Sequence, residues 1–303
     1  MQKSTSKDVK LVSGGVDSFI MAKQFPAGKN VYVDFGQPYK EAELSALVSL
    51  GISVEIVTIH HQQKVGENIF IPDRNLAMAA IVAMLYDPDR ILMAGLRDDN
   101  CVDKTPAEFE RMTALLSRYA SHPIKVVSPY WKMSKGEVVQ NFCREFPGEQ
   151  LVGTFSCYNP QDGQPCGDCP ACLRRVVALE TNGVETGLSL SDRVIREYLP
   201  KISQYDPDRI SRFFIYLRNH GGVEAYDLDG ILAEDRGPYR ARKFLGQLPP
   251  RQKKYRVIYT ARLESDRNET EEWLKKNGVD YDALIMGKLP YDTLVDDKTK
   301  NEL

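Results

Sequence analysis

A glycine-rich loop near the start of the chain has the composition of a phosphate-binding site. Residues 11–18 read Leu-Val-Ser-Gly-Gly-Val-Asp-Ser, between an expected strand and an expected helix. Glycines allow positive φ and close backbone approach, and N–H groups at a helix N-terminus bind phosphate oxygens. No Gly-Lys-Ser/Thr follows, so this is not a Walker loop, and a plain strand-to-helix turn is the alternative. The candidate nucleotide-binding residues here are Ser13, Gly14, Gly15, Val16, Asp17 and Ser18.

Four of the six cysteines have the spacing of a metal site. The pattern Cys-x8-Cys-x2-Cys-x2-Cys is formed by Cys157, Cys166, Cys169 and Cys172. Four thiolates hold Zn²⁺ in a closed tetrahedral site that stabilises structure, and an iron–sulfur cluster is the alternative. Such grouping is typical of a reducing compartment and not of a secreted disulfide framework.

The composition predicts a soluble cytoplasmic protein of about two domains. The chain has 303 residues, is 42% hydrophobic and 27% charged, and carries a net charge of −2. This charge provides no bulk basic field, so direct nucleic-acid binding is not expected. Residues 1–10 do not resemble a secretory signal, and the apolar run 76–86 is too short to span a bilayer.

Strands and helices alternate through the first half, which predicts an α/β fold with a doubly wound parallel sheet. Strands are expected at 31–35, 54–59, 91–95 and 126–127, and helices at 41–50, 76–85 and 107–119. Ser134 and Glu137 form the capping-box pattern of a further helix. Ligands of such sheets lie beyond the carboxyl ends of the strands, where the loop at Ser13, Phe35 and Gly95 are expected.

Carboxylates follow the strand that ends at Gly95. Asp98, Asp99 and Asp103 lie on this loop, at the edge expected to bind ligand. They are candidates to bind Mg²⁺ or the edge of a purine-like base, and a solvated acidic loop is the alternative. Asp99 and Asp103 are included with Phe35 and Gly95 among the candidate cofactor-binding residues.

The second half predicts a smaller α/β domain. Helices are expected at 189–199, 208–217 and 265–277, and strands from 223, at 255–259, 283–286 and 293–295. His220-Gly221-Gly222 has the composition of a linker. The predicted boundaries are a first domain at 1–200, a helical connector at 201–222 and a second domain at 223–303.

The first half resembles the 7-cyano-7-deazaguanine synthase family, within the ATP-pyrophosphatases (adenine nucleotide alpha-hydrolase-like proteins). The matching motifs are Ser-Gly-Gly-Val-Asp-Ser (13–18), Phe-Gly-Gln (35–37) with Glu43, Pro-Asp-Arg-Asn (72–75), Ser-Lys-Gly-Glu (134–137), Ser-Cys-Tyr (156–158) and Cys-Gly-Asp-Cys-Pro-Ala-Cys-Leu-Arg-Arg (166–175). They span roughly residues 8–182.

The resemblance implies a ligase of queuosine biosynthesis that uses ATP, ammonia, Mg²⁺ and a structural zinc, in a homodimer. It implies adenylation of a 7-carboxy-7-deazaguanine carboxylate, then amide and nitrile formation. Residues 13–18 would hold the phosphates and the metal, while Lys135 and Arg74 would neutralise charge on pyrophosphate. Lys135, Arg74 and Asp17 are therefore candidate catalytic residues.

Two segments depart from the family pattern. Gly-Gln is usually followed by Arg-His, whereas Pro38 and Tyr39 stand here, and the usual Tyr-Pro-Asp-Cys-Arg before Glu-Phe is replaced by residues 102–107. Asp103 would take the place of the family's aspartate, one position out of register. The substrate of this chain is thereby left open, as is whether its product is an amide or a nitrile.

The second half resembles small phosphatases of the haloacid-dehalogenase type. The match implies that Asp227 is the nucleophile, Asp229 the general acid/base, and that Thr260 and Lys288 bind the phosphoryl group. Asp296 and Asp297 would hold Mg²⁺ with Asp227 and Asp229. Aspartates that favour strand ends and turns are the alternative.

Two functions remain open at this point. The first is a 7-cyano-7-deazaguanine synthase-like ligase with an appended phosphatase domain. The second is an ATP-pyrophosphatase that acts on a different carboxylate or on a macromolecule, with the C-terminal domain serving as a non-catalytic dimerisation or partner module. A tRNA-thiolating enzyme is a weaker alternative, since these enzymes share the loop but need a reactive cysteine such as Cys101.

Overall fold

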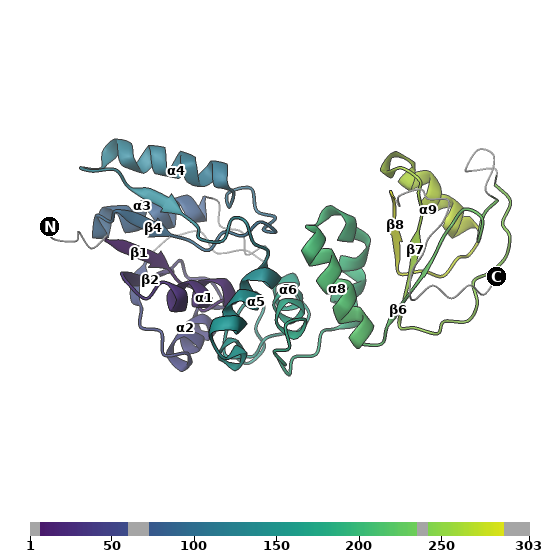
Figure 1. The fold of residues 1–303 in the computed structure, drawn as a ribbon, viewed down its shortest axis with the longest axis horizontal. Coiled ribbons are helices and arrows are strands. Elements are labelled where there is room, and N and C mark those ends of the chain that lie inside the picture. The colour runs from purple at the N-terminus through teal and green to yellow at the C-terminus, as the bar shows by residue number, and fades with distance from the viewer. Residues whose placement is uncertain (1–6, 60–72, 235–241, 288–303) are drawn as a thin grey trace. The chain divides into compact units, whose positions relative to one another are not determined.

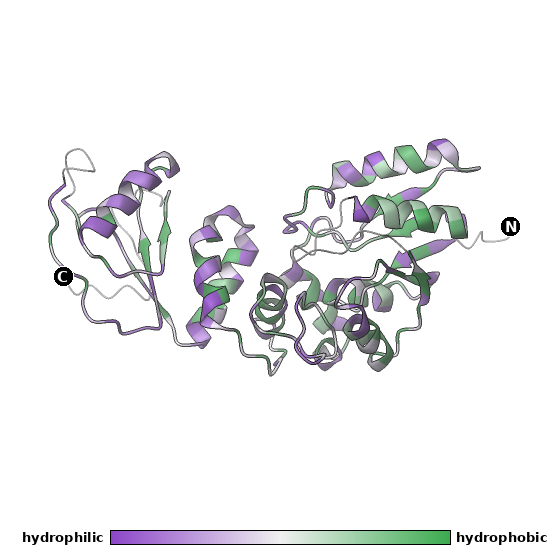
Figure 2. Cartoon of the chain, turned by 180° about the vertical axis from the view of Figure 1, so that it is seen from behind, coloured by the Kyte–Doolittle hydropathy of each residue, from purple (hydrophilic) through white to green (hydrophobic). Residues whose placement is uncertain are grey.

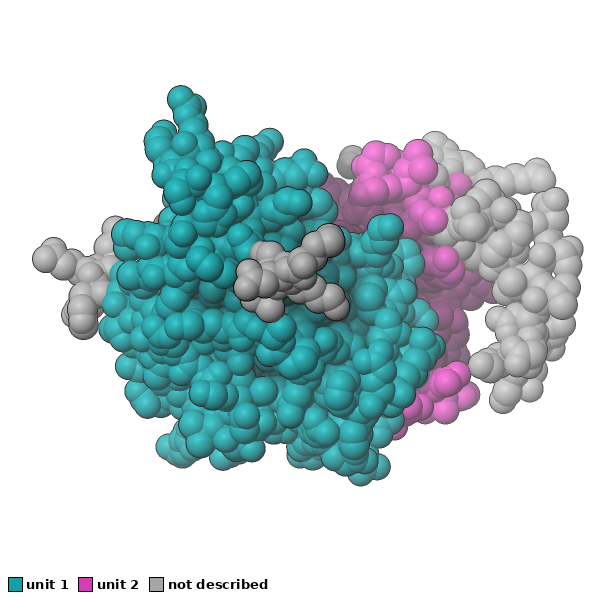
Figure 3. All heavy atoms as spheres, turned by 60° about the vertical axis from the view of Figure 1, so that its left-hand side comes forward, with its two compact units in different colours: residues 1–195, 205–216 teal, residues 196–204, 217–303 magenta. Residues whose placement is uncertain are grey.

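The computed structural model describes residues 7–59, 73–234 and 242–287 (Figure 1). The chain divides into two compact units, coloured separately in Figure 3. The first comprises residues 1–195 and 205–216, and the second comprises residues 196–204 and 217–303. Within the described residues no helix is long and apolar enough to cross a membrane.

The first unit contains a five-stranded parallel sheet, which confirms the predicted α/β class. Its strands are β1 (Asp8–Leu11), β2 (Lys29–Asp34), β3 (Glu55–Thr58), β4 (Arg90–Leu92) and β5 (Lys125–Val127). The order β3-β2-β1-β4-β5 places β1 in the centre. Strands β2 and β3 are added on one side of β1, and β4 and β5 on the other. In a doubly wound sheet this is the point where ligands bind, and the glycine-rich loop follows β1.

Helices cover both faces of this sheet, as Figure 1 shows. They are α1 (Val16–Gln24), α2 (Lys40–Ser49), α3 (Arg74–Tyr86), α4 (Pro106–Tyr119), α5 (Lys135–Glu145) and α6 (Pro170–Glu180), with the 3₁₀ turn η1 (Gly148–Leu151). Ala79 of α3 and Phe109 of α4 join one apolar cluster with the strands, whereas Phe19 of α1 and Phe142 of α5 join another on the opposite face.

Local sequence signals set several helix ends. Ser134 and Glu137 form the predicted capping box of α5, with the Ser134 side chain accepting from the Glu137 N–H at 3.1 Å. Thr105 caps α4 in the same way, and Pro106 occupies its first turn, where a missing N–H costs nothing. The buried Lys10 ammonium donates to the carbonyls of residues that follow α1, at 2.6 and 2.7 Å.

The second unit contains a three-stranded parallel sheet in the order β6-β7-β8. Its strands are β6 (Val223–Tyr226), β7 (Tyr255–Tyr259) and β8 (Ala283–Ile285), and its main helix is α9 (Arg267–Lys276), after the short turn η4 (Glu264–Asp266). Figure 2 shows hydrophobic strands beside a largely hydrophilic α9, whose Trp273 and Leu274 are nevertheless buried. The predicted strand 293–295 lies outside the described residues.

In the sequence, the stretch that precedes β6 forms α7 (Asp192–Tyr198), the 3₁₀ turn η2 (Leu199–Gln204) and α8 (Pro207–Asn219). Both helices were expected from their apolar periodicity. Proline begins α8, consistent with the preference of proline for a first helical turn.

Candidate functional site

The loop 13–18 is tightly ordered at the N-terminus of α1. Gly14 has φ +75°, and a Cβ added there would lie 2.8 Å from the Glu43 carbonyl oxygen, so only glycine fits. The Ser18 hydroxyl donates to the Gly15 carbonyl at 3.0 Å and accepts from the Ser13 N–H at 3.1 Å. Because Gly15 is the N-cap and has no side chain to accept from the first turn, the N–H groups of α1 suit an anionic ligand.

Lys135 and Asp17 form an ion pair beside this loop. The Lys135 Nζ donates to both Asp17 carboxylate oxygens, at 2.7 and 2.6 Å. Lys135 is only 8% exposed, and burial lowers its pKa although Asp17 opposes the shift. The structure thus brings together two predicted residues from α1 and α5, and places a buried ammonium next to a candidate phosphate site.

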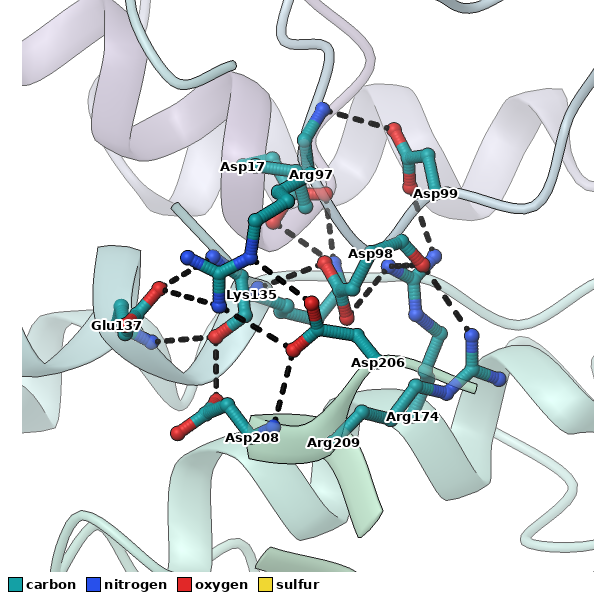
Figure 4. Close-up of polar contacts among 12 residues, drawn as sticks. Asp17, Arg97, Asp98, Asp99, Lys135, Glu137, Arg174, Asp206, Asp208 and Arg209 are labelled. Atoms are coloured by element: carbon teal, nitrogen blue, oxygen red, sulfur yellow. Dashed lines mark hydrogen bonds and ion pairs between the residues drawn. The ribbon is translucent and has the colours of Figure 1, made fainter. Parts of the chain in front are cut away.

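The loop after β4 adds a buried set of charges, drawn in Figure 4. Arg174 of α6 pairs with Asp98 at 3.0 Å and with Asp99 at 2.9 Å. Lys104 pairs with the second oxygen of Asp99 at 2.8 Å. Burial alone would raise the pKa of Asp99, but Lys104 and Arg174 hold it well below its usual range. Asp98 and Asp99 therefore pair with partly buried basic side chains and do not form a solvated acidic loop.

Gly95 and Asp103 lie elsewhere on this loop, in different surroundings. A Cβ on Gly95 would come within 2.2 Å of the Trp131 ring, so the backbone packs directly against the indole. The Asp103 carboxylate accepts from the Asn75 side chain at 2.8 Å. The predicted loop carboxylates therefore divide between two different sets of partners.

A buried polar network connects the end of β2 with α2. The Tyr32 hydroxyl donates to Glu43 at 2.7 Å and accepts from Gln37 at 2.6 Å, while the Phe35 N–H donates to Gln37 at 2.9 Å. Burial raises the pKa of Glu43 to about 7, although the hydrogen bonds from Tyr32 and Gln37 oppose the shift. The carbonyl of Glu43 contacts Gly14, so this network supports the glycine-rich loop.

Arg74 lies at the start of α3, where its guanidinium donates to the Tyr39 hydroxyl at 3.2 Å. The Tyr39 ring packs against Tyr158 with a centroid distance of 5.8 Å. Tyr39 is one of the two residues that stand in place of the family's Arg-His. Arg74 thus lies with an aromatic pair, whereas Lys135 is the cation held by Asp17.

The four predicted cysteines come together. Their sulfur atoms all lie within 4.8 Å of one another, and Cys157 lies 3.4 Å from Cys166. A tetrahedral site with Zn–S bonds of ~2.3 Å places sulfurs about 3.8 Å apart, so the donor set fits zinc. Backbone N–H groups of residues 159, 166, 168 and 172 donate to these sulfurs at 3.3 to 3.4 Å, an arrangement that suits thiolate ligands. The cluster could bind a metal in the closed manner of a structural site.

The second unit places Asp229 in an ion-pair cluster after β6. Arg262 donates to it from Nε at 2.9 Å and from Nη2 at 2.5 Å, and Arg242 donates at 2.5 Å. Thr260, after β7, donates to the same carboxylate at 3.4 Å. Burial raises the pKa of Asp229, but the two arginines outweigh it and hold the pKa below its ordinary value.

The remaining predicted residues of this unit are only partly placed. One Asp227 carboxylate oxygen accepts from the following backbone N–H at 2.8 Å. Lys288, Asp296 and Asp297 lie outside the described residues. The structure therefore brings Thr260 and Asp229 together, describes Asp227 after β6, and gives no position for Lys288, Asp296 or Asp297.

Several site residues were not singled out from the sequence. Lys104 is one of them, and so is a group around the start of α5 that comprises Arg97, Asp206, Asp208, Arg209 and Arg212. Arg174 was noted only within the cysteine motif. The only sequence signal for these residues was that some of them lie next to a glycine or a helix cap. Their ion-pair partners are distant in the sequence, so the pairs could not be predicted.

Comparisons with known proteins find similarity in the N-terminal part of the chain. Residues 36–183, which begin after the glycine-rich loop, match the family model described as "Queuosine biosynthesis protein QueC". The 7-cyano-7-deazaguanine synthase of Marinomonas sp. (strain MWYL1) is 26% identical over 212 residues, covering 59% of this chain and 95% of that protein. That of Leptospira interrogans (strain Fiocruz L1-130) is 28% identical and covers 60% of this chain and 89% of its own length.

A third relative, the 7-cyano-7-deazaguanine synthase of Pyrococcus furiosus, is 28% identical over 162 residues, covering 48% of this chain and 67% of that protein. Among solved structures, a predicted subunit of tRNA methyltransferase from Methanocaldococcus jannaschii is 16% identical and covers 45% of this chain and 75% of its own, with a TM-score of 0.35. Residues 36–183 thus match the QueC family, and about 60% of the chain has 7-cyano-7-deazaguanine synthases as its homologues.

Proposed function

We propose that this protein is an ATP-dependent ligase that adenylates a 7-carboxy-7-deazaguanine-like carboxylate and converts it with ammonia to the amide or nitrile. The observation that carries the proposal is the Lys135–Asp17 pair beside the glycine-rich loop, within a unit whose relatives are named 7-cyano-7-deazaguanine synthase. The pair therefore lies beside the N-terminus of α1, whose N-cap Gly15 has no side chain to bond to the first turn.

The chemistry requires positioning and charge stabilisation more than a nucleophilic side chain. A carboxylate is a poor electrophile, so its oxygen first attacks the α-phosphorus of ATP and pyrophosphate leaves. Ammonia then attacks the acyl-adenylate and expels AMP, which gives the amide. A second adenylation, now on the amide oxygen, followed by loss of AMP and a proton gives the nitrile. Each step develops negative charge on phosphate oxygens, where preorganised cations and N–H groups act most strongly.

Residues of this chain have defined roles in that scheme. The N–H groups of residues 16–18 bind phosphate oxygens, and Lys135 neutralises the charge that develops on the leaving pyrophosphate. Asp17 would hold Mg²⁺, which prefers oxygen ligands, and the ion would screen the charge of the ATP phosphates. Arg74 would also neutralise charge on pyrophosphate, and its partner Tyr39, which replaces a family residue, would contribute to recognition of a different substrate.

Zinc in the four-cysteine site has a structural role. Cys169 caps α6, and the same helix carries Arg174, which holds Asp98 and Asp99. Binding zinc would fix the start of α6 and, through Arg174, the loop after β4. The ligands have no open position for substrate, so no chemical step involves this metal.

Product analysis tests the proposal. Purified protein is incubated with ATP, Mg²⁺, ammonium and 7-carboxy-7-deazaguanine, and products are identified by mass spectrometry beside Asp17→Ala and the exposed-site control Glu41→Gln. We expect amide or nitrile from the wild type and the control, and none from Asp17→Ala. Absence of both products at saturating substrate would refute this substrate assignment.

A second candidate function is adenylation of a different carboxylate, small or macromolecular. The observation in its favour is that Tyr39, which replaces a family residue, contacts Arg74 and Tyr158. AMP release that depends on another carboxylate, with none from 7-carboxy-7-deazaguanine, would select this candidate.

The second unit is proposed as a phosphatase-like domain, with Asp227 as nucleophile and Thr260 as a phosphoryl-binding residue. Asp229 would be the general acid/base, but its two arginine partners keep the carboxyl ionised and oppose the acid role. Release of phosphate from p-nitrophenyl phosphate with Mg²⁺, lost in Asp227→Asn, supports the phosphatase. Equal release by wild type and Asp227→Asn supports a non-catalytic module instead.

A further inference from the structure

Residues 205–216 belong to the first compact unit, although they lie outside the stretch 36–183 that matches the family model. This segment contains most of α8 and the turn before it. Its charged side chains are directed at the start of α5 and at the loop after β4, as Figure 4 shows for Asp206, Asp208 and Arg209.

The first contact point is the N-terminus of α5. The Ser134 hydroxyl, which caps this helix, donates to the Asp208 carboxylate, and Arg212 donates to the same carboxylate at 2.8 Å. A Cβ on Gly136 would lie 1.9 Å from the Arg212 Nε, so the guanidinium fills the space that glycine leaves. Lys135 stands between these two contacts, and its backbone is therefore held from both sides.

The second contact point is the loop after β4. Asp206 accepts from the Arg97 guanidinium at two atoms, at 2.8 and 3.2 Å, and Arg97 also pairs with Glu137 at 3.0 Å. Arg209 donates to the Asp98 carbonyl at 3.3 Å. Because one Asp98 carboxylate oxygen accepts the N–H of residue 135 at 2.9 Å, the loop and the helix start are joined as one assembly.

We infer that residues 205–216 are a positioning element for Lys135 and Asp98 in the adenylation site, with Asp206, Asp208 and Arg212 as positioning residues. The inference rests on the proposed function, since that function gives Lys135 its role. These contacts come from residues outside the stretch 36–183 that matches the family model.

The physical reason is the cost of misplacing a cation. Lys135 acts on developing charge, and a displacement of about 1 Å can cost on the order of 100-fold in rate. Ser134, which caps the first turn of α5, also donates a hydrogen bond to Asp208. The two-atom pairing of Arg97 with Asp206 fixes the loop after β4. Removing either carboxylate frees one side of this assembly while leaving the Lys135–Asp17 contact chemically possible.

The test uses the full chain with Asp206→Ala, Asp208→Ala and the control Arg218→Ala, an exposed residue near the end of the same helix. Two readouts are taken: kcat and KM for ATP in AMP release with 7-carboxy-7-deazaguanine, and hydrogen exchange of peptides covering residues 132–140. The second readout needs no turnover.

We expect both aspartate variants to lower kcat by about tenfold or more with KM for ATP changed less than about threefold, and to speed exchange at 132–140. Arg218→Ala should change neither. Unchanged kcat and unchanged exchange in both aspartate variants would overturn the inference. If the wild type releases no AMP, the proposed function fails, and faster exchange at 132–140 still decides whether the segment positions the start of α5.

Discussion

The Lys135 Nζ lies 2.6 and 2.7 Å from the two carboxylate oxygens of Asp17, although the residues are 118 positions apart. Asp17 lies in the first turn of α1 and Lys135 in the first turn of α5, so two helix N-termini meet at this pair. A polyanion placed there would meet the Lys135 ammonium, the Asp17 carboxylate paired with it, and the positive ends of two helix dipoles. This arrangement motivates the first prediction.

Removing the Lys135 ammonium should impair adenylation far more than folding. We expect Lys135→Ala to lower kcat for AMP release about 100-fold or more, because the loss is of a preorganised charge at the phosphates. Lys132→Ala is the control, since this exposed lysine lies three residues earlier. Steady-state AMP release checks the prediction, and equal rates for the two variants would show that Lys135 has no role in the chemistry.

The four-cysteine site should contain about one zinc ion per chain. Cys172→Ser removes one ligand and should abolish stoichiometric zinc in elemental analysis and lower the thermal unfolding midpoint. Cys101→Ser, at an exposed cysteine outside the cluster, should retain the metal. Iron with sulfide in the wild type, or zinc retained by Cys172→Ser, would contradict the assignment.

Glu43 should make stability depend on pH. Its pKa is raised in the folded protein from 4.5 to about 7, so the folded state binds this proton more tightly and loses up to about 3 kcal/mol of stability as pH rises through that range. Glu43→Gln should remove this decline and be the more stable protein at pH 8.

Thermal unfolding midpoints at pH 5 and pH 8 measure the effect. Glu41→Gln, at an exposed position of the same helix, should retain the wild-type pH dependence. A decline from pH 5 to pH 8 that is as steep in Glu43→Gln as in the wild type would exclude Glu43 as its source.

Gly95 should be coupled to Trp131. Gly95→Ala inserts a methyl group against the indole and should destabilise the protein by about 1–3 kcal/mol. The cost should be smaller when Trp131→Leu is also present, because the smaller side chain leaves room. A double-mutant cycle measured by unfolding tests this, and additive effects within about 0.5 kcal/mol would contradict the contact.

The sequence predicted those parts of the molecule that depend on local pattern. Alternating strands and helices gave the parallel sheet, the Ser134–Glu137 spacing gave the capping box, and the cysteine spacing gave the cluster. Each depends on residues close in the chain or on periodicity, which one sequence carries.

Long-range ion pairs could not be predicted in the same way. Nothing near Arg97 indicates that Asp206, 109 positions later, is its partner. Asp229 also matched a strand-end motif, yet its pairing with Arg262 and Arg242 depends on tertiary packing that brings arginines to that edge. Partner choice among many charged residues is decided by the fold and not by local spacing.

The most direct measurement follows the oxygen atoms of the carboxylate. In the proposed reaction, ammonia displaces AMP from an acyl-adenylate, so the bridging oxygen leaves with AMP. With 7-carboxy-7-deazaguanine labelled with ¹⁸O in its carboxylate, mass spectrometry should find one ¹⁸O in each AMP that is released. AMP without label, or ADP and phosphate in its place, would contradict adenylation of this carboxylate.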